Sequence, residues 1–248
     1  MDLHPTPEGW DPAAALAAVK ARVHVAEAAA GRAGSGVRVL VATKTWDADA
    51  AVAVVRAGGI LVGESRMQEL EAKAPALAAA GARIHVIGQL QRNKASVAVR
   101  WAECVQTVDS ARLAERLSRL SLEAERPLDV MIQVNVSGEE SKAGVHPDEA
   151  LPIAAAVQAL PGLTVTGFMT IGLNSPDEAA VREGYARLRE IRDQALIRSE
   201  RGSMGLASAW QLSMGMSQDL EWAIAEGATM VRVGTAIMGP RLASDSHW

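Results

Sequence analysis

Lys44 is the residue of this sequence whose type and position most directly suggest chemistry. It ends the stretch 37–44, in which five of the first six residues are apolar and three of those are β-branched. Such a stretch predicts a strand buried on both faces, with an amine where the strand stops. The amine either has its charge in solvent at the end of a long stem or is held in a site for its reactivity. The stretch alone leaves both interpretations open.

Two turns near the C-terminus suggest a site for an anion. Gly215-Met216-Ser217 opens a predicted helix, and Gly234-Thr235 follows the last predicted strand. In barrels of alternating strands and helices, the loops after the seventh and eighth strands frequently bind phosphate through backbone N–H groups. Either turn alone is also typical of an ordinary tight connection with a serine cap. The two together, in these positions, favour a phosphate site.

A lysine and a phosphate site together indicate pyridoxal phosphate, whose aldehyde forms an imine with an uncharged amine. Burial lowers the pKa of a lysine and so supplies more of the uncharged form. Arg232, on the last predicted strand, could face the pyridine nitrogen of this cofactor. Because arginine only donates hydrogen bonds, it would keep that nitrogen unprotonated and make the ring a weak electron sink. An ion pair with an acidic residue at a strand end is the alternative for Arg232.

The elements that must position these groups alternate regularly along the chain. Strands are predicted near residues 37–44, 60–63, 83–88, 104–108, 128–134, 163–169, 210–213 and 229–233, with a helix after each of the first seven. A further helix is predicted from residue 12 to about residue 32, where alanine is frequent. Eight units in 248 residues predict a single (β/α)8 TIM barrel of the α/β class, a fold that takes about 250 residues. An open doubly wound sheet is the alternative, which we disfavour because no G-x-G-x-x-G motif follows a strand.

A barrel of this kind places its active site at the C-terminal ends of its strands. The residues that end the predicted strands are Lys44, Glu64, Ser65, Gln89, Asn135, Met169, Thr170, Ser213, Gly234 and Thr235.

Composition narrows the class of partner. The 25 Lys and Arg against 29 Asp and Glu give a net charge of -4, which argues against nucleic acid or an anionic membrane surface. Cys104 is the only cysteine and cannot form an internal disulfide, and the five histidines lack the paired spacing of zinc ligands, so we expect no metal. No apolar run approaches the roughly 18 residues of a membrane span, and the amino terminus does not resemble a secretory signal. We expect a soluble, cytoplasmic monomer with a flexible arm over residues 1–11 and a single domain over 12–248.

Five sequence blocks resemble the pyridoxal phosphate homeostasis protein family. The blocks are Val41–Thr45, Gly63–Glu69, His85–Lys94, Leu212–Ser217 and Val231–Gly239. The resemblance runs from about residue 12 to Arg241, with all blocks in order, and it implies the barrel of the alanine racemase N-terminal domain. His85 matches a family histidine, but we leave it outside the site because a strand histidine is more often satisfied in the core.

The resemblance also implies which residues hold the cofactor. Lys44 would carry the imine, and Arg232 would lie at the pyridine nitrogen. Ser65 stands where the family usually has asparagine and is predicted as a ring contact. Contacts to the phosphate would come from Ser213, Met216, Ser217, Gly234 and Thr235.

Racemases of this fold take a second base from a tyrosine in an added β-domain of a partner subunit. This chain ends at Trp248, and its one tyrosine, Tyr185, lies in a predicted helix. Loss of one of two acid/base groups can cost about 10²- to 10⁴-fold in rate. We therefore expect a protein without catalytic turnover that holds pyridoxal 5′-phosphate as a lysine imine and takes part in intracellular vitamin B6 homeostasis. Apoenzymes that require the cofactor are its expected partners.

Two other functions remain open. One is a pyridoxal phosphate-dependent racemase or lyase of low activity that uses the same lysine. The other is a barrel enzyme for a phosphorylated metabolite, in which Lys44 is a plain phosphate or carbanion contact and no cofactor is bound.

Overall fold

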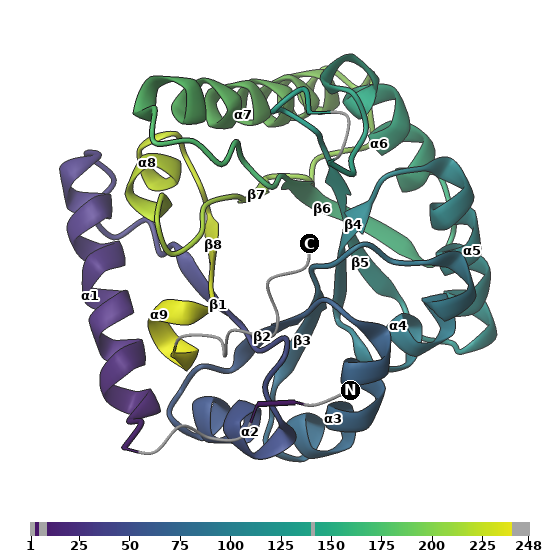
Figure 1. Cartoon of the computed structure of the whole chain (residues 1–248). Helices are drawn as coiled ribbons and strands as arrows, with labels where there is room; N and C mark the ends of the chain where they lie inside the picture. The colour runs from purple at the N-terminus through teal and green to yellow at the C-terminus, as the bar shows by residue number, and fades with distance from the viewer. Residues whose placement is uncertain (1–2, 5–8, 140–141, 240–248) are drawn as a thin grey trace.

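The computed structural model describes residues 3–4, 9–139 and 142–239. In this part of the chain, eight parallel strands close into a barrel in the order of the sequence (Figure 1). The strands are β1 (Arg38–Ala42), β2 (Leu61–Glu64), β3 (Arg83–Val86), β4 (Cys104–Val108), β5 (Leu128–Gln133), β6 (Leu163–Met169), β7 (Gln211–Ser213) and β8 (Met230–Val233). The ladder that closes the barrel joins β1 to β8, from the pair Arg38 and Met230 to the pair Val41 and Val233. The predicted (β/α)8 barrel is confirmed.

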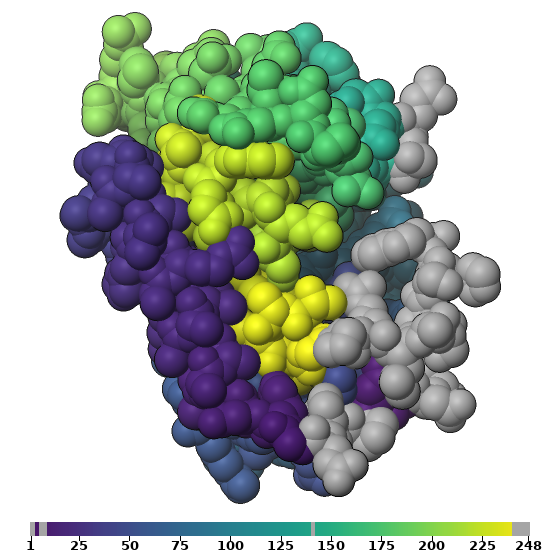
Figure 2. Space-filling view, turned by 60° about the vertical axis from the view of Figure 1, so that its left-hand side comes forward, coloured from purple at the N-terminus to yellow at the C-terminus, as the bar shows by residue number. Residues whose placement is uncertain are grey.

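Helices surround the barrel on its outside (Figure 1). They are α1 (Pro12–Ala29), α2 (Ala48–Arg56), α3 (Met67–Ala79), α4 (Ala95–Trp101), α5 (Ala111–Glu123), α6 (Ala150–Gln158), α7 (Glu178–Glu200), α8 (Leu220–Ala225) and α9 (Thr235–Met238), with 3₁₀ turns η1 (Arg92–Lys94) and η2 (Pro147–Glu149). The side chains of Asp11, Asp47 and Asp177 accept N–H groups of the first turns of α1, α2 and α7, which explains where these helices begin. The expected extra N-terminal helix is α1, which packs on α8 and α9 (Figure 2). No helix within the described ranges has the length and hydropathy to cross a membrane.

The core has two layers. A large cluster fills the space between the strands and the helices. A smaller cluster inside the barrel consists of Leu40, Leu61, Cys104, Met131, Met169 and Met230. Successive side chains of a strand point to opposite faces, so a strand such as β1, with Leu40 inside the barrel and Val41 outside it, contributes to both layers. On β2, Gly63 faces the interior, since an added Cβ would lie 2.4 Å from Leu40 Cδ2, and the following Glu64 faces the helices.

The structure differs from the predicted elements at their ends. β1 ends at Ala42 because the chain turns over residues 43–46, so Lys44 lies in a turn and not on the strand. The predicted helix near 93–102 begins as η1, and α9 is a short helix where no element was predicted.

The domain boundaries stay predictions. Of the predicted arm, residues 1–2 and 5–8 lie outside the described residues, while His4 forms a parallel bridge with Trp46. Residues 240–248 at the end of the predicted domain also lie outside the description.

Candidate cofactor site

The predicted site residues lie at the C-terminal end of the barrel, where parallel strands bring their ends together. Lys44 follows β1, and Ser65 follows β2. Arg232 lies on β8, and Ser213 ends β7. Because β1 pairs with both β2 and β8, the turn with Lys44 lies between the strand ends that carry Ser65 and Arg232.

Arg232 is buried inside the barrel, with 6% of its surface exposed. Its Nη1 donates to Ser213 Oγ at 2.9 Å, and its Nη2 donates to the carbonyl oxygen of Thr170 at 2.7 Å. Burial lowers the pKa of the guanidinium, but arginine stays protonated in proteins. Among the described residues, no carboxylate forms an ion pair with Arg232. The two contacts use two of its five N–H groups, so the others can serve a ligand.

A directed chain of hydrogen bonds leads from Arg232 across the barrel interior. Arginine can only donate, so Ser213 Oγ accepts from it and gives its own proton to Gln106 Oε1 at 2.7 Å. The amide nitrogen of Gln106 then donates to Nδ1 of His85 at 2.8 Å. Burial lowers the pKa of His85 to about 3. His85 is therefore neutral in the interior, with Nδ1 accepting from Gln106 and its proton on Nε2.

This series of hydrogen bonds determines which hydrogen bonds Ser213 can make to a ligand. Its side chain is fully buried, its proton is donated to Gln106, and one lone pair takes Arg232. A direct phosphate contact through the hydroxyl would compete with both bonds. The contacts that Ser213 makes in this structure orient Arg232.

The turn after β7 is held from below by two buried side chains. Asp219 Oδ1 accepts the backbone N–H of Met216 at 2.6 Å, and Asp219 Oδ2 accepts the hydroxyl of Tyr185 at 2.6 Å. Gly215 has φ +89°, and an added Cβ would lie 2.4 Å from Ala223 Cβ. Only glycine suits this backbone, which is left-handed and closely packed. The backbone N–H of Met216, one possible phosphate donor, is thus engaged by Asp219.

The two turns predicted to bind phosphate lie side by side. Thr235 Oγ1 and Ser217 Oγ are 3.5 Å apart. Among the backbone hydrogen bonds of turns and loops in the described ranges, none uses the N–H of Ser217, Gly234 or Thr235. Unpaired N–H groups at the start of a helix attract anions. The pair of turns therefore offers both hydroxyls and N–H donors to a phosphate.

Ser65 is half-buried at the end of β2. An added Cβ on Gly88 would lie 2.3 Å from the carbonyl oxygen of Ser65. The segments that follow β2 and β3 are in close contact here, and this contact holds the backbone of Ser65 in place.

Lys44 lies half-buried in the turn 43–46. The next residue, Thr45, has φ +72°. A β-branched residue in this region is strained by about 1–3 kcal/mol and persists only where its surroundings hold it. Such strain is common at ligand sites.

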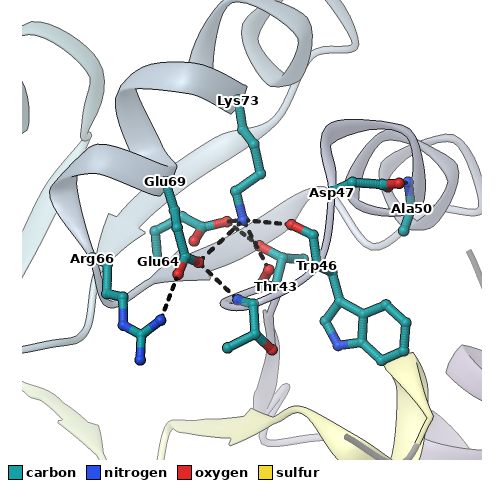
Figure 3. Close-up of polar contacts among 9 residues, drawn as sticks. Thr43, Trp46, Asp47, Ala50, Glu64, Arg66, Glu69 and Lys73 are labelled. Carbon is teal, nitrogen blue, oxygen red and sulfur yellow. Dashed lines mark hydrogen bonds and ion pairs between the residues drawn. The ribbon is translucent and has the colours of Figure 1, made fainter. Parts of the chain in front are cut away.

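The surroundings that hold this turn are a buried group of charges, the Lys73 cluster, which consists of Lys73, Glu64 and Glu69 (Figure 3). Each of the three side chains is at most 1% exposed. Lys73 Nζ lies 2.6 Å from Glu64 Oε1 and 3.8 Å from Glu69 Oε2. Burial raises the pKa of Glu64, although Lys73 and Thr43 oppose this effect. Glu64 was predicted as a strand-end site residue, but it points away from the barrel mouth, toward α3.

The sequence did not predict the residues that hold the candidate site residues in position. Gln106 contacts Ser213, 107 residues away, and Lys73 contacts Thr43, 30 residues away. Asp219 lies only three residues after Met216, whose backbone N–H it accepts. A signal existed only for Lys73, which lies four residues after Glu69 on one face of α3.

The donor set suits pyridoxal phosphate. The site combines an amine on a turn, a buried guanidinium with spare donors and a pair of turns with N–H donors. These match an aldehyde, a ring nitrogen that accepts a hydrogen bond and a phosphate.

Comparison with known proteins agrees with this chemistry. The profile of the family described as "Alanine racemase, N-terminal domain" matches residues 11–241. The pyridoxal phosphate homeostasis protein of Pseudomonas aeruginosa is 41% identical over 227 residues, which cover 91% of this chain and 94% of that protein. The protein of the same name from Escherichia coli is 36% identical over 233 residues, covering 91% and 95%.

Solved structures show the same barrel. PipY of Synechococcus elongatus with PLP bound is 30% identical, covers 92% of this chain and 100% of its own, and superposes with a TM-score of 0.79. A protein of unknown function from Bifidobacterium adolescentis is 41% identical, with a TM-score of 0.85 over 91% of this chain and 94% of its own. An alanine racemase of Clostridium difficile shares the fold at 15% identity and a TM-score of 0.65, over 86% of this chain and 55% of its own.

Proposed function

Since this chain belongs to the pyridoxal phosphate homeostasis protein family and carries the alanine racemase N-terminal domain, we propose that it binds pyridoxal 5′-phosphate at the C-terminal mouth of its barrel. In this proposal it holds the cofactor for intracellular vitamin B6 homeostasis and delivers it to apoenzymes. The PLP-bound relative PipY supports the choice of cofactor.

The observation that carries the proposal is the state of Arg232. A buried guanidinium needs partners, and this one has a serine hydroxyl and a carbonyl but no described carboxylate. Such an arrangement leaves N–H donors for an uncharged acceptor such as a pyridine nitrogen.

The other residues have distinct roles in the proposal. Lys44 forms the imine with the cofactor. The phosphate is bound by the N–H groups of Ser217, Gly234 and Thr235, with Met216 shaping the turn. Ser65 contacts the ring, and Ser213 orients Arg232. When bound, the cofactor can withdraw electrons from groups attached to its imine, and a donor at the pyridine nitrogen weakens that effect.

A function without turnover is favoured by the place of Tyr185. The hydroxyl is fully buried and donates to Asp219 at 2.6 Å. Burial and the Asp219 carboxylate raise the pKa of this tyrosine above its ordinary value. The one tyrosine of the sequence thus supports the turn after β7 and is poorly placed to act as the second base of a racemase.

Borohydride reduction and peptide mapping test the proposal. The protein incubated with pyridoxal phosphate should gain the reduced adduct on Lys44 and an absorbance band that Lys44→Ala abolishes. Lys20→Ala is the matched control, because Lys20 is exposed on α1. A colourless protein without adduct would favour the enzyme for a phosphorylated metabolite.

A second measurement separates storage from catalysis. Holoprotein incubated with single amino-acid enantiomers should show no appreciable racemisation or cleavage. Transfer is measured by mixing holoprotein with a cofactor-free enzyme and following the recovery of activity, and size-exclusion chromatography tests the expected monomer. Appreciable turnover would establish the racemase or lyase alternative instead.

A further inference from the structure

The backbone on both sides of Lys44 is bound by charged side chains. Lys73 Nζ donates to the carbonyl oxygen of Thr43 at 2.9 Å and to that of Trp46 at 3.1 Å. Glu69 Oε2 accepts the backbone N–H of Thr45 at 2.7 Å. One side chain thus reaches both ends of the turn, and another reaches its centre (Figure 3).

Further contacts hold the side chains of Lys73 and Glu69 in place. Glu64 Oε1 lies 2.6 Å from Lys73 Nζ and accepts the hydroxyl of Thr43 at 2.7 Å. Arg66 Nη1 donates to Glu69 Oε1 at 3.2 Å. Every member of the cluster therefore contacts either the turn itself or another member that does.

Stability is a poor explanation for this arrangement. Removing charges from water is costly, and well-packed apolar residues often replace a buried ion pair without loss of stability. An apolar side chain, however, could not bind two carbonyl groups and one N–H group of a strained turn. What the charges provide here is a defined backbone conformation.

We propose that the Lys73 cluster is a positioning device that sets the place of the Lys44 amine by holding the turn 43–46 in its strained conformation. The cluster binds backbone groups of this turn, so in this proposal it acts through the backbone and does not contact the cofactor. The inference rests on the proposed function, because it gives the positioned amine its purpose.

Glu69 offers the sharpest test, because two substitutions differ in one feature. Glu69→Gln keeps an oxygen that can accept the Thr45 N–H, whereas Glu69→Leu removes it. In cofactor-free protein, we expect the Thr45 amide of Glu69→Leu to exchange hydrogen about tenfold faster than in the wild type, and Glu69→Gln to stay within about threefold. The rate of trapping pyridoxal phosphate on Lys44 with borohydride should fall about ten- to hundredfold in Glu69→Leu and recover in Glu69→Gln.

Lys73 provides a second test that separates position from stability. Lys73→Met leaves Glu64 as an uncompensated charge, and the double variant Lys73→Met/Glu64→Gln removes that charge as well. We expect the double variant to regain most of the lost melting temperature but to keep slow trapping and fast exchange over residues 43–46. Lys20→Met, an exposed lysine on α1, serves as the control and should behave as the wild type.

The outcomes distinguish the two proposals. Wild-type trapping rates in both Glu69→Leu and the double variant would overturn the positioning role. If the wild type itself traps no cofactor on Lys44, the proposed function fails, and the exchange contrast between the two Glu69 variants still decides whether the cluster holds the turn. Should Glu69→Leu not fold, the double variant carries the same comparison.

Discussion

At the scale of single residues, the candidate site depends on hydrogen-bond donors that have few partners within the protein. Arg232 gives two N–H groups to Ser213 and Thr170 and keeps others available. Arginine cannot accept a hydrogen bond, and this sets the direction of every hydrogen bond in the series that leads from Arg232 through Ser213 and Gln106 to His85. Such a chain leaves one arrangement of protons and therefore one orientation of the guanidinium.

Arg232→Lys tests this orientation. Lysine keeps the charge but lacks the planar fork that reaches Ser213 and Thr170 together. We expect the affinity for pyridoxal phosphate to fall about tenfold or more, because a hydrogen bond to a charged group contributes about 1.5–3 kcal/mol. An absorbance titration measures this change. Arg187→Lys is the control, since Arg187 pairs with Asp148 at the surface, and an Arg232→Lys protein with unchanged affinity would contradict the assigned role.

At the scale of elements, each functional turn is supported by a neighbouring helix. α3 supplies Lys73 and Glu69 to the turn after β1. α7 supplies Tyr185, which binds Asp219 under the turn after β7. α1 reaches the same turn, because Arg22 donates to the carbonyl oxygen of Ser217 at 3.2 Å. The helices around the barrel thus determine the shape of its mouth.

Gly215→Ala tests the turn after β7. The added Cβ would meet Ala223 at 2.4 Å on a residue with φ +89°. We expect the free energy of unfolding to fall by about 1–3 kcal/mol and pyridoxal phosphate to bind more weakly. Denaturant unfolding and an absorbance titration measure the two effects.

Gly34→Ala is a matched control for this substitution. Gly34 has φ +77°, but no atom lies within 4 Å of an added Cβ, and it precedes β1 at the opposite end of the barrel. The Gly34→Ala variant should lose stability only because alanine disfavours a positive φ, and it should keep its affinity for the cofactor. Equal affinities in both variants would show that the shape of the turn at Gly215 does not affect binding.

At the scale of the whole molecule, closure of the barrel creates an interior in which polar groups are buried. His85 and Gln106 lie there, with 3% and 0% of their surfaces exposed. A charge on His85 would be unfavourable in this environment and would break its bond from Gln106. The stability of the folded barrel should therefore depend on pH.

The direction of this dependence follows from the two pKa values of His85. Burial lowers the pKa to about 3 in the folded protein, against about 6.5 in the unfolded chain. The contribution of this group is complete above about pH 6.5 and is lost as the pH falls toward 3. Between pH 7 and pH 5, we expect it to reduce the free energy of unfolding by about 2 kcal/mol.

Urea unfolding at the two pH values measures the effect. His85→Gln should remove most of this pH dependence, while His146→Gln should leave it, because the His146 side chain is 68% exposed. The same pH dependence in wild type and His85→Gln would mean that other groups cause it.

Sequence patterns were sufficient to predict the barrel and to nominate the residues of its candidate site. Apolar stretches of strand length that alternate with helices determine which faces are buried, and parallel strands necessarily bring their ends together. Lys44, Arg232 and the turns at Gly215 and Gly234 could be predicted because each stands next to a strand end that its own local sequence reveals. Lys44 was predicted at the end of the strand. It lies in a turn instead, because side chains distant in the sequence bind the backbone of that turn and no neighbouring residue indicates these contacts.

Only the tertiary structure decided how these residues are held. Ser213 and Gln106 are 107 residues apart, and Lys73 and Thr43 are 30 apart. Such partners meet because the strands close in a particular register and the helices pack at particular heights. Local periodicity determines the face on which a side chain lies, but it cannot determine which atom from a distant strand or helix that side chain will meet. The sequence therefore sufficed to nominate the amine at Lys44, and the packing around it decided the conformation of the turn that presents this amine.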